Sequence, residues 1–85
     1  MAVRIAVIGA GYFAHFHQDA WMRLPGAELV GICDLEGERA AAAAAVHGVP
    51  AFTDREEMFA ATKPDLVDIV TPPASHLELV TAAAK

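Results

Sequence analysis

The sequence has few of the residues that build disulfides, metal centres and nucleic-acid sites. Its one cysteine, Cys33, excludes an intramolecular disulfide and any metal site that needs several cysteines. Six Lys and Arg stand against eleven Asp and Glu, for a net charge of -5, and the basic residues do not cluster. Because nucleic-acid binding requires cations that neutralise phosphates, this balance argues against a nucleic-acid partner.

Long hydrophobic runs are missing too. No apolar stretch approaches the length of a membrane span or a secretion signal, and Met1 leads directly into a predicted strand that contains Arg4. We therefore expect a cytoplasmic protein that is neither exported nor inserted into a membrane. Since a nucleotide-binding domain usually needs about 100–150 residues, a chain of 85 residues is expected to be part of a larger protein.

What the sequence does contain is a series of short, β-branched apolar runs separated by helical stretches. The runs Val3–Ile8, Leu29–Cys33 and Leu66–Val70 are apolar at consecutive positions, as in strands that are buried on both faces of a parallel sheet. A weaker strand is predicted around Pro50–Phe52. Alternating strands and helices predict an α/β fold, a doubly wound parallel sheet with strand order 3-2-1-4.

The turn after the first strand has the pattern of a dinucleotide site. The residues Gly9-Ala10-Gly11-Tyr12-Phe13-Ala14 follow a predicted strand and open a predicted helix, in a G-x-G-x-x-A arrangement. Gly9 permits a tight turn, Gly11 lets a phosphate approach the backbone, and Ala14 allows the helix to pack closely on the strand. The backbone N–H groups of Tyr12 and Phe13 are expected to face the pyrophosphate.

An acidic residue, Asp34, stands at the end of the second apolar run. A carboxylate there can accept hydrogen bonds from both ribose hydroxyls of an adenosine, whereas a 2′-phosphate would meet its negative charge, so the sequence favours NAD over NADP. A tight turn without a ligand is the simplest alternative. A P-loop would need Gly-Lys-Ser/Thr, which is missing, while an S-adenosylmethionine site remains a less favoured reading.

Local signals place the buried faces and the starts of the helices. On the first helix, one apolar face is expected to contain Phe13, Phe16, Ala20 and Leu24, with Trp21 beside it. Thr53 with Glu56 and Ser75 with Glu78 form capping boxes that predict the starts of a third and a fourth helix. The fourth helix is expected to run to the end of the chain.

A second informative stretch, Thr71-Pro72-Pro73-Ala74-Ser75-His76, follows the strand at Leu66–Val70. The prolines fix the chain as it leaves the sheet. In a 3-2-1-4 sheet this stretch arrives beside the Gly9–Ala14 turn, because both follow strands on either side of the topological switch point. Thr71 and His76 are therefore candidates for the wall near the nicotinamide, although a rigid connection with an exposed histidine fits equally well.

Other polar residues favour structural roles. His15 and His17 lie on different faces of a helix with no evident third ligand, so packing or surface histidines are expected rather than a metal site. Cys33 is expected to be a small buried side chain. Asp65 and Asp68 flank apolar residues and are expected to solvate or cap a strand end rather than to act as an acid-base pair.

Together these motifs resemble the amino-terminal part of the Gfo/Idh/MocA oxidoreductase family. The resemblance is carried by IAVIGAGYFAHFH at Ile5–His17, GICD at Gly31–Asp34 and KPDLVDIVTPPASH at Lys63–His76, and by the spacing between them. It implies a Rossmann domain that binds NAD, less favourably NADP, in a two-domain enzyme that is often a dimer or tetramer. The implied reaction is hydride transfer at a CH–OH group of a sugar, inositol or related polyol.

The resemblance also assigns site residues. It implies pyrophosphate contacts at Gly9, Gly11, Tyr12, Phe13 and Ala14, an adenosine ribose contact at Asp34, and a nicotinamide-side wall at Thr71, Pro72 and His76. The family continues with a G-K-x-V-x-x-E-K-P strand, whose lysine is catalytic, and with a substrate domain. Residues 1–85 therefore correspond to the amino-terminal part of the dinucleotide-binding domain, in which no catalytic residue is expected. The chain alone is expected to be inactive, and a non-catalytic NAD-binding sensor is the alternative.

Overall fold

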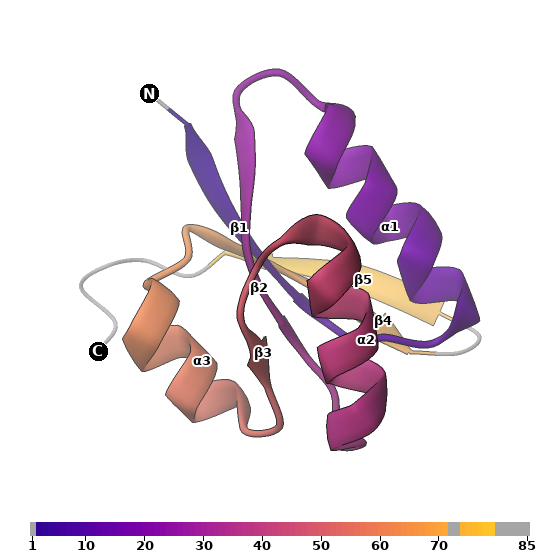
Figure 1. Cartoon of the computed structure of the whole chain (residues 1–85). Helices are drawn as coiled ribbons and strands as arrows, with labels where there is room; N and C mark the ends of the chain where they lie inside the picture. Colours follow the sequence, from indigo (N-terminus) through magenta and orange to yellow (C-terminus); the bar gives the residue numbers. More distant parts are fainter. Residues whose placement is uncertain (1, 72–73, 80–85) are drawn as a thin grey trace.

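The computed structural model describes the backbone of residues 2–71 and 74–79 and the side chains of residues 2–11 and 14–70. One sheet with the order β3-β2-β1-β4-β5 forms its centre (Figure 1). The strands are β1 Val3–Ile8, β2 Ala27–Cys33, β3 Ala51–Phe52, β4 Leu66–Thr71 and β5 Ala74–Leu79, and the helices are α1 Tyr12–Arg23, α2 Gly37–His47 and α3 Arg55–Thr62. Since β1–β2, β1–β4 and β2–β3 are parallel, the expected order 3-2-1-4 is confirmed.

Helices cover both faces of the sheet. Successive residues of β1 point to opposite faces and therefore pack against different helices. Ile5 and Val7 pack in a cluster with Ala14 of α1 and Ala43 of α2. Ala6 packs in a second cluster with Met58 of α3. The consecutive apolar residues of β1 thus bury both of its faces, as the sequence predicts for a central parallel strand.

The remaining helices differ in how they meet the sheet. The inner face of α2 is made of alanines, Ala40, Ala43 and Ala44, whose small side chains let the helix lie close to the strands. For α3 the predicted cap is wrong by one residue, since Asp54, not Thr53, is the N-cap and accepts a 2.8 Å hydrogen bond from the Glu56 N–H.

Across the described part of the chain, no helix has the length and apolar character that a membrane crossing requires.

The predicted buried face of α1 is wrong. Ala14 and Gln18 are the buried residues and Trp21 packs against the core, whereas Phe16 and Leu24 are 60% and 50% exposed. Ala20 is exposed as well, and the Phe13 side chain lies outside the described residues. The apolar pattern misleads here because α1 also contacts the rest of the fold through polar groups: Gln18 donates a hydrogen bond to the Gly9 carbonyl and Trp21 donates one to Asp68.

The strongest of these polar contacts converges on Asp68, in the middle of β4. Its side chain is 2% exposed, and its Oδ2 atom accepts hydrogen bonds from His17 Nδ1 at 2.8 Å and Trp21 Nε1 at 2.9 Å. Asp68 is therefore an internal anchor for α1, and its expected role at a strand end is wrong. Asp65, by contrast, is exposed and accepts from the Arg4 N–H at 2.9 Å, in agreement with a capping role.

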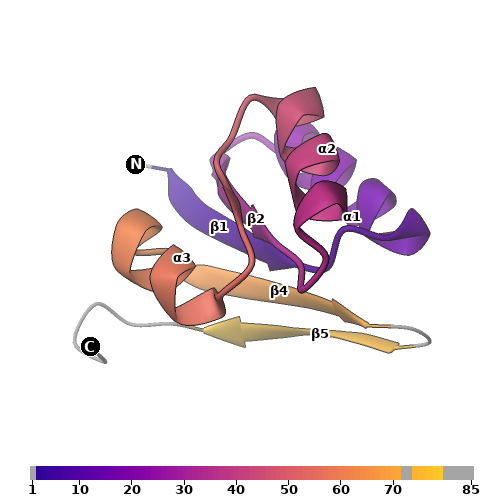
Figure 2. The same cartoon turned by 60° about the horizontal axis from the view of Figure 1, so that its bottom comes forward.

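The predicted fourth helix is also wrong over the described residues. Ala74–Leu79 forms β5, which runs antiparallel to β4 at the edge of the sheet (Figure 2). The capping box at Ser75 and Glu78 is a local signal, and pairing with β4 satisfies the backbone groups of an edge strand that would otherwise lack partners. Residues 80–85, where the helix was expected to continue, lie outside the described residues.

The Asp68 anchor predicts a stability difference between two carboxylates. Asp68→Leu should lower the free energy of unfolding by about 2–4 kcal/mol, because it leaves the partly buried Trp21 N–H without its acceptor and His17 without its partner. Asp19→Leu removes the same charge from an exposed site on α1 and should change stability by no more than about 0.5 kcal/mol. Urea unfolding of both variants tests this, and equal midpoints would show that Asp68 is not an anchor.

Candidate dinucleotide-binding site

Gly9, the residue that follows β1, lies against the backbone of Val70 in β4. Its φ of 117° lies in the region that favours glycine, and a Cβ atom there would overlap the carbonyl oxygen of Val70. The Gly9 N–H donates to the Cys33 carbonyl at 2.7 Å. One residue without a side chain therefore brings the first turn into contact with the carboxyl ends of both neighbouring strands.

Gly11 begins α1 and leaves its amino terminus uncovered. It is the N-cap residue, makes no side-chain capping bond, and is followed by a first turn without an acidic residue. Ala14, one turn on, is 2% exposed and packs in the core. The first-turn N–H groups, which include those of Tyr12 and Phe13, are free of a side-chain cap and present a partial positive charge that suits a phosphate.

Asp34 links this turn to the end of β2. Its Oδ2 atom accepts from the Ala10 N–H at 2.9 Å, and its Oδ1 atom accepts from the Glu36 N–H at 2.8 Å. The carboxylate is thereby fixed beside the glycine turn, as the sequence predicts from its place after the second strand. Because each carboxylate oxygen can accept a further hydrogen bond, Asp34 keeps acceptor capacity for a pair of hydroxyl groups.

Gln18 of α1 contacts the turn, and the sequence motifs did not point to it. Its side chain is fully buried, and Nε2 donates to the Gly9 carbonyl at 3.2 Å. A glutamine in the middle of a helix looks like a surface residue, and the only available signal was its position four residues after Ala14, on the same helix face. Gln18 therefore links α1 to the Gly9 turn by a hydrogen bond.

The second predicted stretch meets the site only in part. Ile8 of β1 pairs with Ile69 of β4, so the backbone of Thr71 reaches the same edge of the sheet as the Gly9 turn. The backbone of His76 pairs with Ile69 inside β5 instead of starting a helix. Pro72 and the side chains of Thr71 and His76 lie outside the described residues, so their contacts with a nicotinamide remain predictions. The side chains of Tyr12 and Phe13 lie outside the described residues as well, and the pyrophosphate contacts of their backbone N–H groups also remain predictions.

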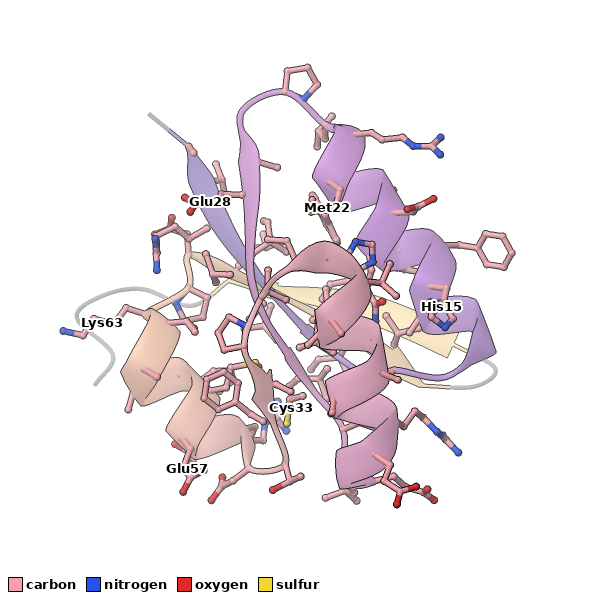
Figure 3. The ribbon with its side chains drawn as sticks, in the orientation of Figure 1. His15, Met22, Glu28, Cys33, Glu57 and Lys63 are labelled. Carbon is pink, nitrogen blue, oxygen red and sulfur yellow. The ribbon has the colours of Figure 1, made fainter. Side chains whose placement is uncertain are left out.

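The two histidines of α1 and Cys33 show no sign of a chemical role in this site. His15 is on the exposed side of α1 (Figure 3), while His17 is bound to Asp68. Cys33 is 4% exposed at the end of β2, which confirms the small buried side chain expected there. Burial raises the pKa of the Cys33 thiol, and Asp34 raises it further, so this thiol stays protonated near neutral pH. Among the described side chains no three potential ligands gather around a metal position.

Comparison with known proteins agrees with this geometry. A protein-family model, described as an oxidoreductase family with an NAD-binding Rossmann fold, matches residues 3–85. The chain belongs to the Gfo/Idh/MocA family. This Gfo/Idh/MocA chain therefore has the NAD-binding Rossmann fold of that family, and the resemblance seen in its motifs is confirmed.

Curated relatives of this Gfo/Idh/MocA chain are dehydrogenases. It is 41% identical over 81 residues to the D-apiose dehydrogenase of Paraburkholderia graminis, covering 94% of this chain and 22% of that protein. It is 30% identical over 84 residues to the inositol 2-dehydrogenase of Rubrobacter xylanophilus, covering 98% of this chain and 24% of that protein. The chain thus spans about a quarter of the length of these relatives.

Solved structures of dehydrogenases show the same fold, and one of them contains NADH. The WlbA dehydrogenase from Bordetella pertussis, in complex with NADH and UDP-GlcNAcA, is 32% identical and superposes with a TM-score of 0.78 over 85% of this chain and 23% of its own. A myo-inositol dehydrogenase from Corynebacterium glutamicum is 35% identical, with a TM-score of 0.77 over 85% of this chain and 22% of its own.

The contact at Gly9 predicts an unusually costly substitution. Gly9→Ala should lower the free energy of unfolding by about 2–4 kcal/mol, because the methyl group meets the Val70 carbonyl and the positive φ is strained. Gly26→Ala is the matched control, since Gly26 has a φ of 87° but no neighbouring atom of the described residues within 4 Å of the added methyl. It should cost about 1–2 kcal/mol from backbone strain alone. Equal losses in chemical denaturation would contradict the close approach to Val70.

Proposed function

We propose that this chain forms the cofactor-binding part of an NAD-dependent dehydrogenase that acts on a sugar, inositol or related polyol. The observation that carries the proposal is the joint position of Asp34 and the uncapped start of α1, on either side of the Gly9 turn. A carboxylate and a helix amino terminus in that arrangement suit the ribose and the pyrophosphate of one dinucleotide. The named activities of the relatives support the substrate class.

The chain's own groups fit the cofactor. The N–H groups of the first α1 turn would hold the pyrophosphate, Asp34 would accept from the adenosine ribose hydroxyls, and the close packing of Ala14 keeps α1 near the turn. Thr71, Pro72 and His76 are proposed to border the nicotinamide. The dinucleotide itself supplies the hydride chemistry, and the described residues bind and orient it without a catalytic residue of their own.

The choice of NAD over NADP rests on the fixed carboxylate. Asp34 is held by two backbone N–H groups, at 2.8 and 2.9 Å, and so cannot easily turn away from an incoming ligand. A 2′-phosphate beside it would bring two negative charges together, whereas a 2′-hydroxyl would donate a hydrogen bond to it. These contacts support a preference for NAD.

Further features of the intact protein that carries this sequence are proposed from its family membership. We propose a second, substrate-binding domain that carries the catalytic residues, a homo-oligomeric assembly and a cytoplasmic location. The non-catalytic sensor is the weaker alternative, because the curated relatives with which the chain shares its motifs are named as dehydrogenases.

The proposal predicts a measurable cofactor preference. Calorimetric titration of the intact protein that carries this sequence should show tighter binding of NAD than of NADP. Asp34→Ser should weaken NAD by about tenfold or more and shift the preference toward NADP, because it removes a charged acceptor of ribose hydroxyls. Asp19→Ser, at an exposed carboxylate on α1, should leave both affinities unchanged. A protein that binds neither dinucleotide, or an unchanged ratio in Asp34→Ser, would overturn the proposal.

A further inference from the structure

Gln18 is buried in a way that stability alone does not explain. Its side chain is fully buried on α1, its Nε2 atom donates one hydrogen bond, and its Oε1 atom has no hydrogen-bond partner among the described residues. A buried acceptor that is left unpaired costs at least as much free energy as a typical hydrogen bond contributes. An apolar side chain of the same length would fill the position without that cost, so the glutamine is expected to serve another purpose.

The hydrogen bond of Gln18 acts on one peptide unit of the glycine turn. Nε2 donates to the Gly9 carbonyl at 3.2 Å, and the Ala10 N–H of the same peptide donates to Asp34 Oδ2 at 2.9 Å. A trans peptide is planar, with its C=O and N–H directed to opposite sides. One side chain from α1 and one from the residue after β2 therefore hold the same peptide plane from its two sides.

The orientation of this peptide bears directly on the Asp34 carboxylate. Because Gly9 restricts its own backbone dihedrals less than a residue with a side chain would, the peptide that follows it depends on its hydrogen bonds. A rotation of the peptide would turn the Ala10 N–H away from Asp34 Oδ2 and leave that carboxylate held only by the Glu36 N–H, at 2.8 Å. Gln18 opposes this rotation from the carbonyl side of the peptide.

We infer that Gln18 is a positioning residue for the dinucleotide, which holds the Gly9–Ala10 peptide in the orientation that keeps the Asp34 carboxylate directed at the adenosine ribose. The inference rests on the proposed function of Asp34. Gln18 acts through the peptide and not by contact with the dinucleotide, because its side chain is fully buried. Since its unpaired Oε1 atom lowers stability, the residue gives up stability in exchange for cofactor affinity.

The test compares NAD affinity with thermal stability in the intact protein that carries this sequence. Gln18→Met keeps the length of the side chain and removes both amide atoms, so calorimetric titration should show NAD binding weakened by about three- to tenfold, the loss expected from one hydrogen bond. Because methionine leaves no unpaired amide oxygen, the variant should unfold at or above the wild-type temperature, and Gln18→Leu should behave in the same way. Thr62→Val is the control, since it removes a buried donor whose bond to the Met58 carbonyl lies in α3, and it should change NAD affinity less than about twofold.

A double-mutant cycle with Asp34→Ala separates positioning from general damage to the turn. If Gln18 acts through Asp34, Gln18→Met should weaken NAD less than about twofold once the carboxylate is already absent. Equal losses in both backgrounds, an unchanged NAD affinity in Gln18→Met, or a Gln18→Met protein that unfolds well below the wild-type temperature would overturn the inference while leaving the proposed function intact. A wild-type protein that binds neither NAD nor NADP would overturn both.

Discussion

The contact between Gly9 and the Val70 carbonyl is the constraint on which the rest of the site depends. Because Gly9 has no side chain, its backbone can lie against the Val70 carbonyl, and β1 and β4 can end side by side. The Gly9 N–H bond to Cys33 then brings in the end of β2. Asp34, which follows Cys33, can consequently accept a hydrogen bond from the Ala10 N–H. The glycine at position 9 therefore sets the geometry of the proposed ribose contact.

Helix α1 is positioned by polar groups more than by apolar area. Asp68 accepts hydrogen bonds from His17 and Trp21 of this helix, and Gln18 of the helix donates one to the Gly9 carbonyl. Buried polar groups are expensive unless they find partners, so these hydrogen bonds favour one orientation of the helix. The Oε1 atom of Gln18 is the exception, since it is buried without a hydrogen-bond partner among the described residues. That orientation aims the uncapped start of α1 along the turn, where an anion benefits from its partial positive charge.

The sequence allowed the parallel strands and the glycine turn to be predicted, because β-branched runs and a G-x-G-x-x-A pattern have few alternative structures. It did not reveal which face of α1 is buried, since Phe16 is more apolar than Gln18 and only the tertiary partners of Gln18 and Trp21 reverse that preference. The capping box at Ser75 failed for the same reason, because strand pairing with β4 overrides a local helix signal.

The most direct test is a crystal structure of the intact protein with NAD. The account predicts the adenosine ribose hydroxyls within hydrogen-bond distance of Asp34 and the pyrophosphate against the N–H groups that open α1. NAD bound with its ribose away from Asp34, or with its pyrophosphate away from the Gly9–Ala14 turn, would contradict the account.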